Sequence, residues 1–597
     1  MKFDYFNHPH KPAPGTARKR ARQLSGDVQD SPASEIPGLL QLQGIKAQAL
    51  NTSRNRLIVT GVLLALAFAV IAGRLVELAV DRDATQKNTA RISETPKPSK
   101  VRANITDRNG ILLATSLPTA ALYANPNHVL DPILAAKRLA RILPELDEAD
   151  LRKKLSSKST FVWLHRNLTP DRQFKVNTLG IPGLYFQGME RRVHPHGALA
   201  AHVLGITDID GKGLSGVEMQ FDNRLTSDGG ALTLSLDIRV QAMFRDALSR
   251  QQNKFSAIGA VGVLLDVQNG EVISMVSLPD YDPNSPVPAA GDAVFNRATK
   301  GVYEMGSTFK LFTAAMALDT GASKMTSRFD ATKPIRIHGF TISDYHAKNR
   351  WLTVPEILIH SSNIGAAKMA MQVGTARQKQ YLRSFGLTQA ASIELPEVGT
   401  PLTPNRWRDV TTMTIAYGYG IAVSPLQLTA AVATLVNGGY RVKPTILLGT
   451  GKKGGERILK AGTSKQMRDL MRLVVTEGSG KNAATKGFLL GGKTGTAEKP
   501  DRQGYGGRRV RSSFIAVFPF DAPRYAVLAL FDEPKGLKET HGNATGGWVA
   551  APVVKEVVQR LSPLLGLRPR TELAVGHEIT KAKIRQVQRR KDSSAVD

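Results

Sequence analysis

The sequence contains no cysteine. A chain without thiols forms no disulfide, no thiolate zinc site and no cysteine nucleophile, and it suits an oxidising compartment. Aromatic residues are also few, at 6% of the chain. None of them is interleaved with the basic runs at residues 18–22 and 586–591, so these runs predict solvated or membrane-facing tails and no nucleic-acid surface.

Acidic residues are too few to balance the basic ones. The chain has 80 Lys and Arg against 50 Asp and Glu, for a formal net charge of +30. Such an excess attracts polyanions, including anionic lipid headgroups and acidic polymers, but the net charge alone does not indicate which of them is bound. The composition is otherwise globular, with 42% hydrophobic residues, and 597 residues exceed what one core usually organises. We therefore expect several folded parts.

Long apolar runs are absent except for one. Residues 57–73 contain no charge, and the apolar character continues to Val80. As a helix, residues 57–80 would cover roughly 36 Å, enough for a bilayer core of roughly 30 Å with Arg74 reaching one interface. The run is too long and too far from the start for a cleaved signal peptide. Arg54 and Arg56 precede it, which predicts a cytoplasmic N-terminus and an exported remainder.

Composition divides the chain into five segments. Two of them are expected to be tails: residues 1–55 form a disordered basic cytoplasmic tail, and residues 566–597 form a basic C-terminal tail. Residues 56–80 form the membrane anchor. Residues 81–230 begin with a polar linker and continue as a small α+β module, and residues 231–565 show longer elements, typical of a second domain.

Several elements can be predicted within these domains. The first domain has strand-like runs at ALYANP and TFVWLH and a helical pattern over residues 131–155. The second begins with a strand that becomes a helix, followed by a hairpin with Asn269-Gly270 at its turn. It ends with two strands, SSFIAVFPF and YAVLALF, and the helix VVKEVVQRLSPLL.

The sharpest chemical feature is GSTFKLFTAAMALDTG, in which Ser307 and Lys310 stand three residues apart at the head of a helical pattern. This spacing places both side chains on one helical face. A serine hydroxyl needs a base within hydrogen-bond reach to become a nucleophile, and a desolvated lysine can serve. Backbone N–H groups at the start of a helix can also stabilise an oxyanion.

Two further motifs follow in order. HSSNIG contains Ser361 and Asn363, and GGKTGTAEK contains Lys493 and Thr494. Each pattern is weak alone, but S-x-x-K, S-x-N and K-T-G in this order match the signature of serine β-lactamases and penicillin-binding proteins. Ser361 can relay a proton between Lys310 and the leaving amine.

The other motif residues suit substrate binding. Asn363 can hold a substrate amide, and Lys493 supplies a positive field that, with Lys310, lowers the pKa of both amines. Thr494 and Thr496 share one face of a strand edge and can bind a substrate carboxylate. Gly492 and Gly495 would let a peptide lie close to that edge.

Two competing patterns carry less weight. Residues 487–494 satisfy the phosphate-loop pattern G-x-x-x-x-G-K-[ST], but polar residues precede it and a segment that cannot be helical follows. The histidines, including those at 194 and 196, lack the spacing of a helical zinc site. We therefore expect no metal site and no nucleotide site.

The exported part as a whole resembles a class B penicillin-binding protein. VRANITDRNGILLA, over 101–114, is similar to the motif that follows the membrane anchor in this family, and residues 192–222 are similar to its pedestal stretch, which ends near Glu218. NRATKGVYEMGSTFK and residues 416–439 resemble the transpeptidase domain. The YGYGI and SPLQL runs favour the division-specific type over the elongation-specific type. Ala103 and His194 depart from the commoner Gly and Tyr.

The resemblance implies an α/β (α+β) architecture: a single transmembrane helix, an extended pedestal and a serine β-lactamase-like domain with an antiparallel five-stranded sheet flanked by helices. It implies a peptidoglycan D,D-transpeptidase in which Ser307 attacks the D-Ala-D-Ala bond of a stem peptide and passes the acyl group to an amine. It also implies acylation by β-lactams, an inner-membrane location at the septum, and no cofactor.

The resemblance further implies partners, namely a membrane-embedded glycan polymerase of the FtsW type and other division proteins. Alternatives remain open at this stage. They are an elongation-type transpeptidase, a β-lactamase, and a non-catalytic division scaffold or β-lactam sensor. The anchor and pedestal argue against a β-lactamase, and the complete motif set argues against an inactive scaffold.

Overall fold

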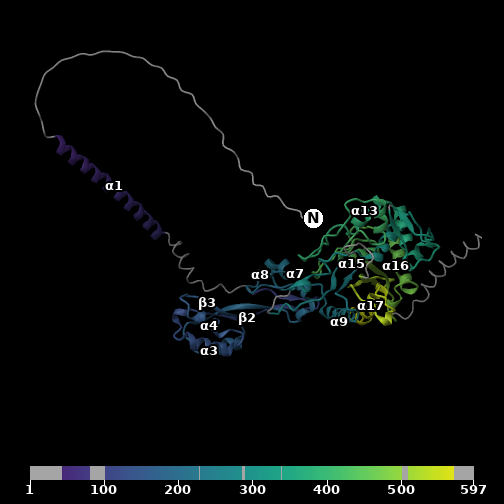
Figure 1. The fold of residues 1–597 in the computed structure, drawn as a ribbon, viewed down its shortest axis with the longest axis horizontal. Coiled ribbons are helices and arrows are strands. Elements are labelled where there is room, and N and C mark those ends of the chain that lie inside the picture. Colours follow the sequence, from purple (N-terminus) through teal and green to yellow (C-terminus); the bar gives the residue numbers. More distant parts are fainter. Residues whose placement is uncertain are drawn as a thin grey trace, which may run out of the picture. The chain divides into compact units, whose positions relative to one another are not determined.

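The computed structural model describes residues 44–80, 101–227, 229–285, 290–337, 339–499 and 509–569. Most of the expected N-terminal and C-terminal tails, and the linker at 81–100, lie outside these residues. The chain separates into two compact units, Met1–Lys97 and Pro98–Asp597. Figure 1 shows the elements of each unit.

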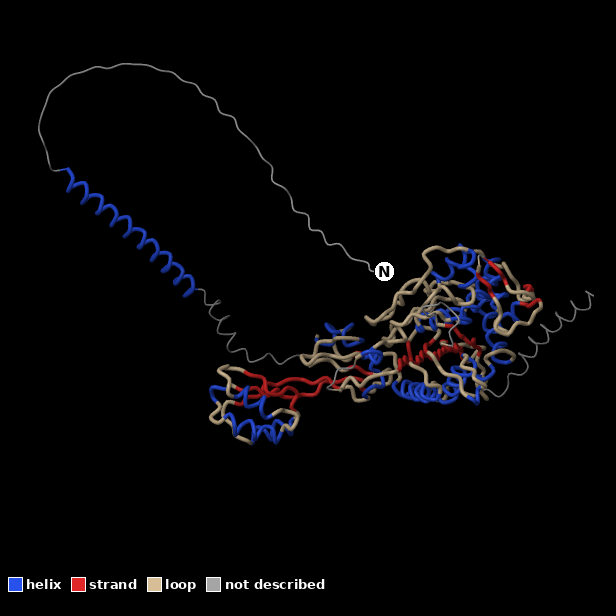
Figure 2. Tube along the Cα trace, viewed as in Figure 1, coloured by secondary structure: helices blue, strands red, loops and turns tan. Residues whose placement is uncertain are grey.

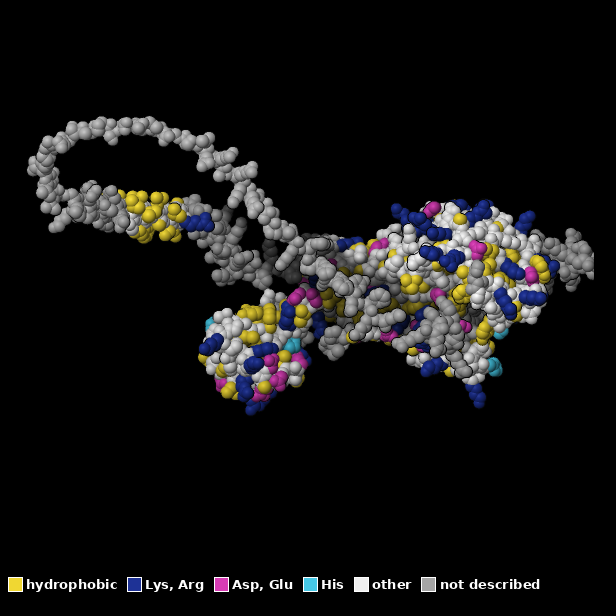
Figure 3. Space-filling model, turned by 45° about the horizontal axis from the view of Figure 1, so that its top comes forward, with side chains coloured by type: hydrophobic (Ala, Val, Ile, Leu, Met, Phe, Trp, Pro, Cys, Tyr) yellow, Lys and Arg dark blue, Asp and Glu magenta, His cyan; other side chains and the backbone are white. Residues whose placement is uncertain are grey.

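The first unit contains one described element, the helix α1 (Gly44–Val80). Its segment Ile58–Val76 has a mean hydropathy of 2.3 and is not buried by the protein. The large apolar side chains of this stretch are each more than half exposed, and Figure 3 shows them on the side of the helix that faces the viewer. A helix that exposes such a surface is long and apolar enough to cross a membrane. The predicted apolar helix is therefore present, although it begins earlier than residue 56.

The second unit begins with the pedestal, whose sheet has the order β3-β2-β1-β5, with β4 pairing β2. The long strands β2 (Leu112–Ala124) and β4 (Leu184–Val193) run antiparallel over ten residue pairs, 115–124 with 184–193. They form the extended ribbon visible in Figure 2. β3 (Val162–Leu168) pairs with the far end of β2. At the other end of β2, β1 (Ile105–Thr106) lies between β2 and β5 (Leu232–Thr233) and pairs with both.

Three capped helices cover one face of the far end of this ribbon. They are α3 (Pro132–Ile142), α4 (Glu148–Leu155) and α5 (Pro170–Thr178), and their N-caps are Asp131, Asp147 and Thr169. Each cap side chain accepts hydrogen bonds from backbone N–H groups that the helix leaves unpaired. Leucines and alanines of the helices and of β2 and β3 pack into a small core, as the predicted α+β module requires.

A buried ionic cluster joins distant parts of the pedestal. Glu218 is fully buried and pairs with Arg102 Nε and Arg192 Nε, each at 2.7 Å. Arg102 also contacts Asp222 at 2.7 Å. His194 lies beside the cluster, and its burial lowers its pKa to about 4. The two stretches that resemble family pedestal motifs, 101–114 and 192–222, thus meet around one carboxylate.

Replacing Glu218 by Ala should destabilise the protein by about 3–5 kcal/mol, because it removes the ion-pair partner of buried Arg192 and leaves buried Arg102 with Asp222 alone. Thermal unfolding of the full-length chain measures this effect. Glu148→Ala, which removes an exposed carboxylate at the far end of the pedestal, serves as the control. An unchanged unfolding temperature for Glu218→Ala would contradict the structural role of the cluster.

The larger part of the second unit, which follows the pedestal, is built on an antiparallel sheet of five strands in the order β12-β13-β14-β6-β7. The strands are β12 (Gly491–Glu498), β13 (Val510–Phe518), β14 (Tyr525–Asp532), β6 (Gly259–Asp266) and β7 (Val272–Leu278). The predicted hairpin is β6–β7, and Gly270 in its turn has φ +81°, which favours glycine. The predicted five-stranded antiparallel sheet is confirmed.

Helices cover both faces of this sheet because its strands are apolar on both sides. α9 (Ile238–Lys254) and α17 (Gly546–Leu561) pack with Leu264 and Phe514 on one face. α10 (Lys310–Asp319), α15 (Pro425–Val436) and α16 (Ala461–Thr476) pack with Val263 on the other. Neighbouring residues of β6 alternate between the two cores, as the period of two in a strand requires.

The remaining elements surround these layers. The helices are α6 (Ala201–Leu204), α7 (Gly216–Gln220), α8 (Asp222–Thr226), α11 (Val354–Ile359), α12 (Asn363–Val373), α13 (Thr375–Ser384) and α14 (Asp409–Ile415). The short strands are β8 (Arg328–Asp330), β9 (Ile335–Ile337), β10 (Phe340–Ile342) and β11 (Trp351–Thr353). The 3-10 turns are η1 (Pro126–His128), η2 (Gly197–Ala200), η3 (Gly291–Val294), η4 (Gly306–Phe309), η5 (Lys481–Ala483) and η6 (Lys538–Thr540).

The base of the pedestal and the part built on the five-stranded sheet share one hydrophobic core. Ile105, Leu113 and Val217 belong to the same buried cluster as Phe312 and Leu528. The backbone of β5 continues into a bridge between Leu234 and Leu447. Packing therefore crosses the boundary predicted near residue 230, and only the far end of the pedestal has a core of its own.

Candidate active site

The S-x-x-K motif lies where a tight turn enters a buried helix. Ser307 belongs to η4, and Lys310 begins α10. Gly306 has φ +53°, and a side chain there would come within 2.6 Å of the carbonyl oxygen of Thr496 on β12. Only glycine allows this approach, so the turn that carries Ser307 is pressed against the strand that carries K-T-G.

Lys310 is the centre of the site. Its Nζ lies 2.8 Å from Ser307 Oγ, 2.7 Å from the Ser361 carbonyl oxygen, 3.1 Å from Ser361 Oγ and 2.7 Å from Asn363 Oδ1. The side chain is 1% exposed. Burial, aided by the charge of Lys493, holds the pKa of Lys310 well below its usual value. A lysine made neutral in this way can accept a proton from Ser307.

The S-x-N motif occupies the junction between two helices. α11 ends at Ile359 and α12 begins at Asn363, with Ser362 as its N-cap. Ser361 has φ +57°, an uncommon conformation for a residue with a side chain. Such strained positions persist only where their surroundings hold them. Here the backbone and the side chain of Ser361 both face Lys310.

Asp344 holds this junction and was not found by sequence reasoning. Its carboxylate accepts hydrogen bonds from the backbone N–H groups of Asn363 (2.6 Å) and Ile364 (3.0 Å) and from Ser362 Oγ (2.7 Å). Ser343 O accepts from Asn363 Nδ2 at 2.8 Å. A carboxylate at the start of α12 complements the helix dipole. It also raises the pKa of Lys310, against the larger effect of burial.

The K-T-G motif lies on β12, which is an edge strand of the sheet. Lys493 is fully buried, and its Nζ donates to Ser361 Oγ at 3.0 Å and to the Thr494 carbonyl oxygen at 3.1 Å. Burial lowers the pKa of Lys493 to about 7. Ser361 Oγ thus lies between two amines, as expected for a proton relay. Both lysine pKa values are lowered, but burial is the larger cause for Lys310 and the cause for Lys493, so the predicted mutual effect is seen for Lys310 alone.

Thr494 and Thr496 alternate with Lys493 and Gly495 along β12, and Thr494 Oγ1 lies 3.3 Å from Lys493 Nζ. Thr494 Oγ1 lies 2.6 Å from Ser479 Oγ, and Thr496 Oγ1 accepts a hydrogen bond from the backbone N–H of Gly546, at the start of α17. Ser479 is exposed and follows α16. Sequence reasoning missed it because a lone serine in a Gly-rich turn carries no motif.

The glycines of the motif have a packing role. A side chain at Gly492 would meet the Ile515 carbonyl oxygen and the Phe514 ring at 2.7 Å. One at Gly495 would lie 2.3 Å from Ser513 Oγ. Both glycines are thus required inside the domain, and their part in substrate binding stays a prediction.

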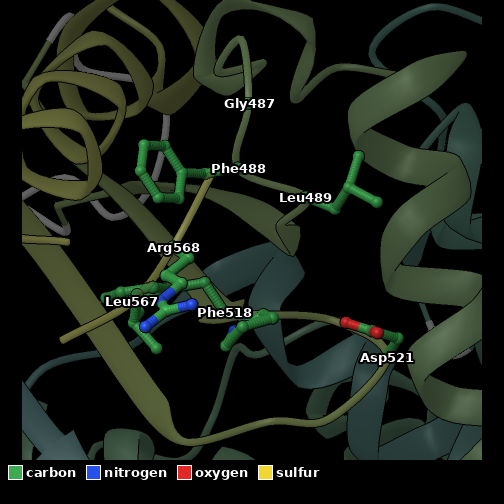
Figure 4. A pocket seen from close by; sticks show the side chains of 8 residues that line it. Gly487, Phe488, Leu489, Phe518, Asp521, Leu567 and Arg568 are labelled. Carbon is green, nitrogen blue, oxygen red and sulfur yellow. The ribbon is translucent and has the colours of Figure 1, made fainter. Parts of the chain in front are cut away.

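The phosphate-loop pattern does not form a phosphate loop. Lys493 and Thr494 lie within a β-strand, whereas the pattern needs a loop that opens a helix. Its first residues, Gly487 to Leu489, instead line a hollow with Phe518 and Leu567 (Figure 4). That hollow contains none of the S-x-x-K, S-x-N or K-T-G residues.

Replacing Lys493 by Met should raise the free energy of unfolding below pH 7 by on the order of 2 kcal/mol. The folded-state pKa is about 7 and the ordinary value is 10.5, so the unfolded chain binds the proton more tightly. The loss of folding free energy that this buried amine causes is therefore greatest below pH 7 and becomes smaller as the pH rises toward 10.5.

Urea unfolding at pH 6 and pH 9.5 measures this difference, with Lys465→Met, at an exposed lysine, as the control. A Lys493→Met variant that is less stable than the unsubstituted chain at pH 6 would contradict the depressed pKa.

Comparison with known families accounts for this arrangement. Residues 260–559 match the model of the penicillin binding protein transpeptidase domain, and residues 98–241 match the model of the penicillin-binding protein dimerisation domain. A "probable peptidoglycan D,D-transpeptidase FtsI" of Caulobacter vibrioides is 43% identical over 487 residues, covering 79% of this chain and 82% of that protein. The chain belongs to the penicillin-binding protein transpeptidase family.

Other penicillin-binding proteins show the same relationship. The "peptidoglycan D,D-transpeptidase FtsI" of Escherichia coli K12 is 31% identical over 548 residues, covering 85% of this chain and 91% of that protein. Among solved structures, a peptidoglycan synthetase from Bifidobacterium adolescentis has a TM-score of 0.63 at 24% identity, covering 80% of this chain and 97% of that chain.

Penicillin binding protein 3 from Mycobacterium tuberculosis, complexed with aztreonam, has a TM-score of 0.62 at 24% identity, covering 79% of this chain and 98% of that chain. These structures share the fold. The resemblance to class B penicillin-binding proteins is confirmed, whereas the predicted boundaries at 81–230 and 231–565 and the roles of the site residues stay predictions.

Proposed function

We propose that this chain is a peptidoglycan D,D-transpeptidase that forms its acyl-enzyme on Ser307 and is acylated there by β-lactams. The observation that carries the proposal is the position of Lys310 Nζ, 2.8 Å from Ser307 Oγ and within hydrogen-bond reach of Ser361 and Asn363. The S-x-x-K and S-x-N motifs thus meet around one buried amine, which is the arrangement that serine activation needs. The third motif joins them through Lys493 Nζ, 3.0 Å from Ser361 Oγ.

The acylation step follows from these distances. Neutral Lys310 accepts the proton of Ser307 as Oγ attacks the carbonyl carbon of the penultimate D-Ala. The C–N bond to the terminal D-Ala breaks, and Ser361, 3.1 Å from Lys310 Nζ and 3.0 Å from Lys493 Nζ, relays a proton to the leaving amine. Free D-Ala departs, and the acyl group remains on Ser307.

Transfer to the acceptor reverses these events. The amine of a second stem peptide takes the place of the departed D-Ala, gives up a proton through Ser361, and attacks the acyl carbon. Ser307 regains its proton from Lys310, and a new amide cross-link is formed. The hydroxyls of Thr494 and Thr496 are suited to hold the terminal carboxylate of the donor, since hydroxyl donors can satisfy such an oxygen.

We also propose that the chain is a single-pass inner-membrane protein with its N-terminus in the cytoplasm, working at the division septum. The apolar stretch Ile58–Val76 of α1 and the arginines that precede this stretch support the orientation. The FtsI names of the relatives from C. vibrioides and E. coli support a division role over an elongation role. A membrane-embedded glycan polymerase of the FtsW type and other division proteins are the proposed partners.

The test is transpeptidation by the full-length chain with a D-Ala-D-Ala stem donor and an amine acceptor. Release of D-Ala together with a cross-linked product is expected. Release of D-Ala with hydrolysis alone would favour a carboxypeptidase, and no release by a folded protein would favour a scaffold. Imaging of a fluorescent fusion of this chain tests the proposed location. Signal at the septum is expected, and signal along the side wall would favour the elongation role.

A further inference from the structure

A row of aromatic side chains crosses the far end of the pedestal and takes no part in the steps above. Tyr123 on β2 pairs with Trp163 on β3 and with Tyr185 on β4, and Phe161 directly precedes β3. The ring centroid of Tyr123 lies 4.8 Å from that of Phe161, 5.4 Å from that of Tyr185 and 5.9 Å from that of Trp163. These four side chains together form what we call the aromatic face.

The aromatic face lies on the side of the sheet that the pedestal helices leave uncovered. Leu122 and Leu164 are direct chain neighbours of Tyr123 and Trp163, and they belong to the core that packs against α3, α4 and α5. Because successive side chains of a strand point to opposite sides, the rings point away from that core. Figure 2 shows the described helices of this end on one side of the strands only.

The area of the aromatic face suits a small ligand. Phe161 is 44% exposed and Tyr185 39%, and the other two rings are half-buried. At about 150–250 Å² for each aromatic side chain, the four rings together expose roughly 300 Å². A stable protein–protein interface covers about 800 Å² on each partner. The face is therefore too small to hold a protein by itself, but it matches a short stretch of a polymer built of ring-shaped units.

The polar groups that contact the rings carry little net charge. The hydroxyl of Tyr185 lies 3.0 Å from Nδ1 of the exposed His128. The guanidinium of Arg166 lies 5.3 Å from the centre of the Trp163 ring, but it also pairs with Asp210. A lipid headgroup or an acidic peptide would need unpaired cations. Exposed rings beside hydrogen-bonding groups suit instead a neutral ligand with apolar faces and polar edges.

We propose that the aromatic face binds the glycan chain of peptidoglycan, a neutral polymer of N-acetylated hexosamines. A pyranose ring has apolar C–H faces that pack against aromatic rings, and its hydroxyl and acetamido groups can hydrogen-bond to the polar groups beside them. The inference rests on the proposed transpeptidase function and adds a binding site separate from the three motifs. A pedestal that holds the glycan raises the local concentration of its stem peptides for the active site.

The experiment measures binding of a hexamer of N-acetylglucosamine, which carries no stem peptide, to the full-length chain in detergent by calorimetry. Phe161→Gln/Tyr185→Gln removes the two most exposed rings and leaves the half-buried pair in place. The matched control, Ile133→Gln/Phe174→Gln, removes two exposed apolar side chains from α3 and α5 at the same end of the pedestal. Labelling by benzylpenicillin, measured in parallel, verifies that each variant is folded.

We expect the unsubstituted chain to bind the hexamer and the Phe161→Gln/Tyr185→Gln variant to bind it about tenfold more weakly, as expected for the loss of stacking contacts. The control variant should bind like the unsubstituted chain. In transpeptidation, the aromatic variant should show a KM about threefold to tenfold higher for polymerised glycan that carries stem peptides. Its kcat/KM for a free stem peptide, and its labelling by penicillin, should stay unchanged.

Three binding results would overturn the proposal: no binding of the hexamer by the unsubstituted chain, unchanged binding by the aromatic variant, and an equal loss in the aromatic and control variants. Unchanged hexamer binding together with loss of the septal signal in cells would assign the aromatic face to a protein partner instead. An unsubstituted chain that binds the hexamer but is not labelled by penicillin is a separate outcome. It would remove the proposed function and leave the glycan site in place.

Discussion

Ser307→Ala should abolish covalent labelling by penicillin and lower the acylation rate by about 10⁴-fold or more, because no other hydroxyl takes the place of its Oγ. Ser361 Oγ is the nearest alternative, but it lies between Lys310 and Lys493 as a relay. Fluorescent-penicillin labelling followed over time measures the rate. The variant should fold normally, since it removes one atom from a half-buried position.

The matched control is Ser392→Ala, at an exposed serine far from the three motifs in the sequence. It should label at the rate of the unsubstituted chain. Labelling of Ser307→Ala at more than about one tenth of that rate would remove Ser307 from its assigned role.

Lys310→Gln should slow acylation by about 10³-fold to 10⁴-fold, in the range expected for loss of a positioned general base and of the network that it organises. Glutamine keeps a hydrogen-bonding group near Ser307 Oγ but cannot accept its proton. Lys324→Gln, at an exposed lysine shortly after α10, is the control. The second-order rate constant for β-lactam acylation measures the effect.

The pH dependence tests the same residue. The active form of Lys310 is neutral, and burial holds its pKa well below 10.5. The acylation rate of the unsubstituted chain should therefore rise with pH through this lowered pKa and be lost as the pH falls below it. Lys310→Gln should lack that rise. A profile that rises only near pH 10.5, or a Lys310→Gln variant with an unchanged profile, would show that Lys310 is not the base.

Local patterns in the sequence predicted the parts of the fold that depend on neighbouring residues. The hairpin with Asn269-Gly270 at its turn and the apolar run of α1 each depend on a single segment, and both are present in the structure. The motif residues could be found because their chemistry restricts both their types and their spacing.

The remaining features depend on contacts between distant segments. Asp344 and Ser479 belong to no spacing pattern, and only the fold brings them to Asn363 and Thr494. The division into two domains near residue 230 was predicted because the expected helices and strands become longer after that residue. The sequence could not show that Ile105 and Leu528 pack in one core, because a hydrophobic pattern indicates that a residue is buried but not which residues it packs against.

The central claim is that Ser307 carries the acyl group. The most direct measurement is intact mass and peptide mapping of the unsubstituted full-length chain after reaction with benzylpenicillin. We predict one adduct per chain, stable over the assay and located on the peptide that contains Ser307. An adduct on another residue, or a folded chain that gains no mass, would contradict the account.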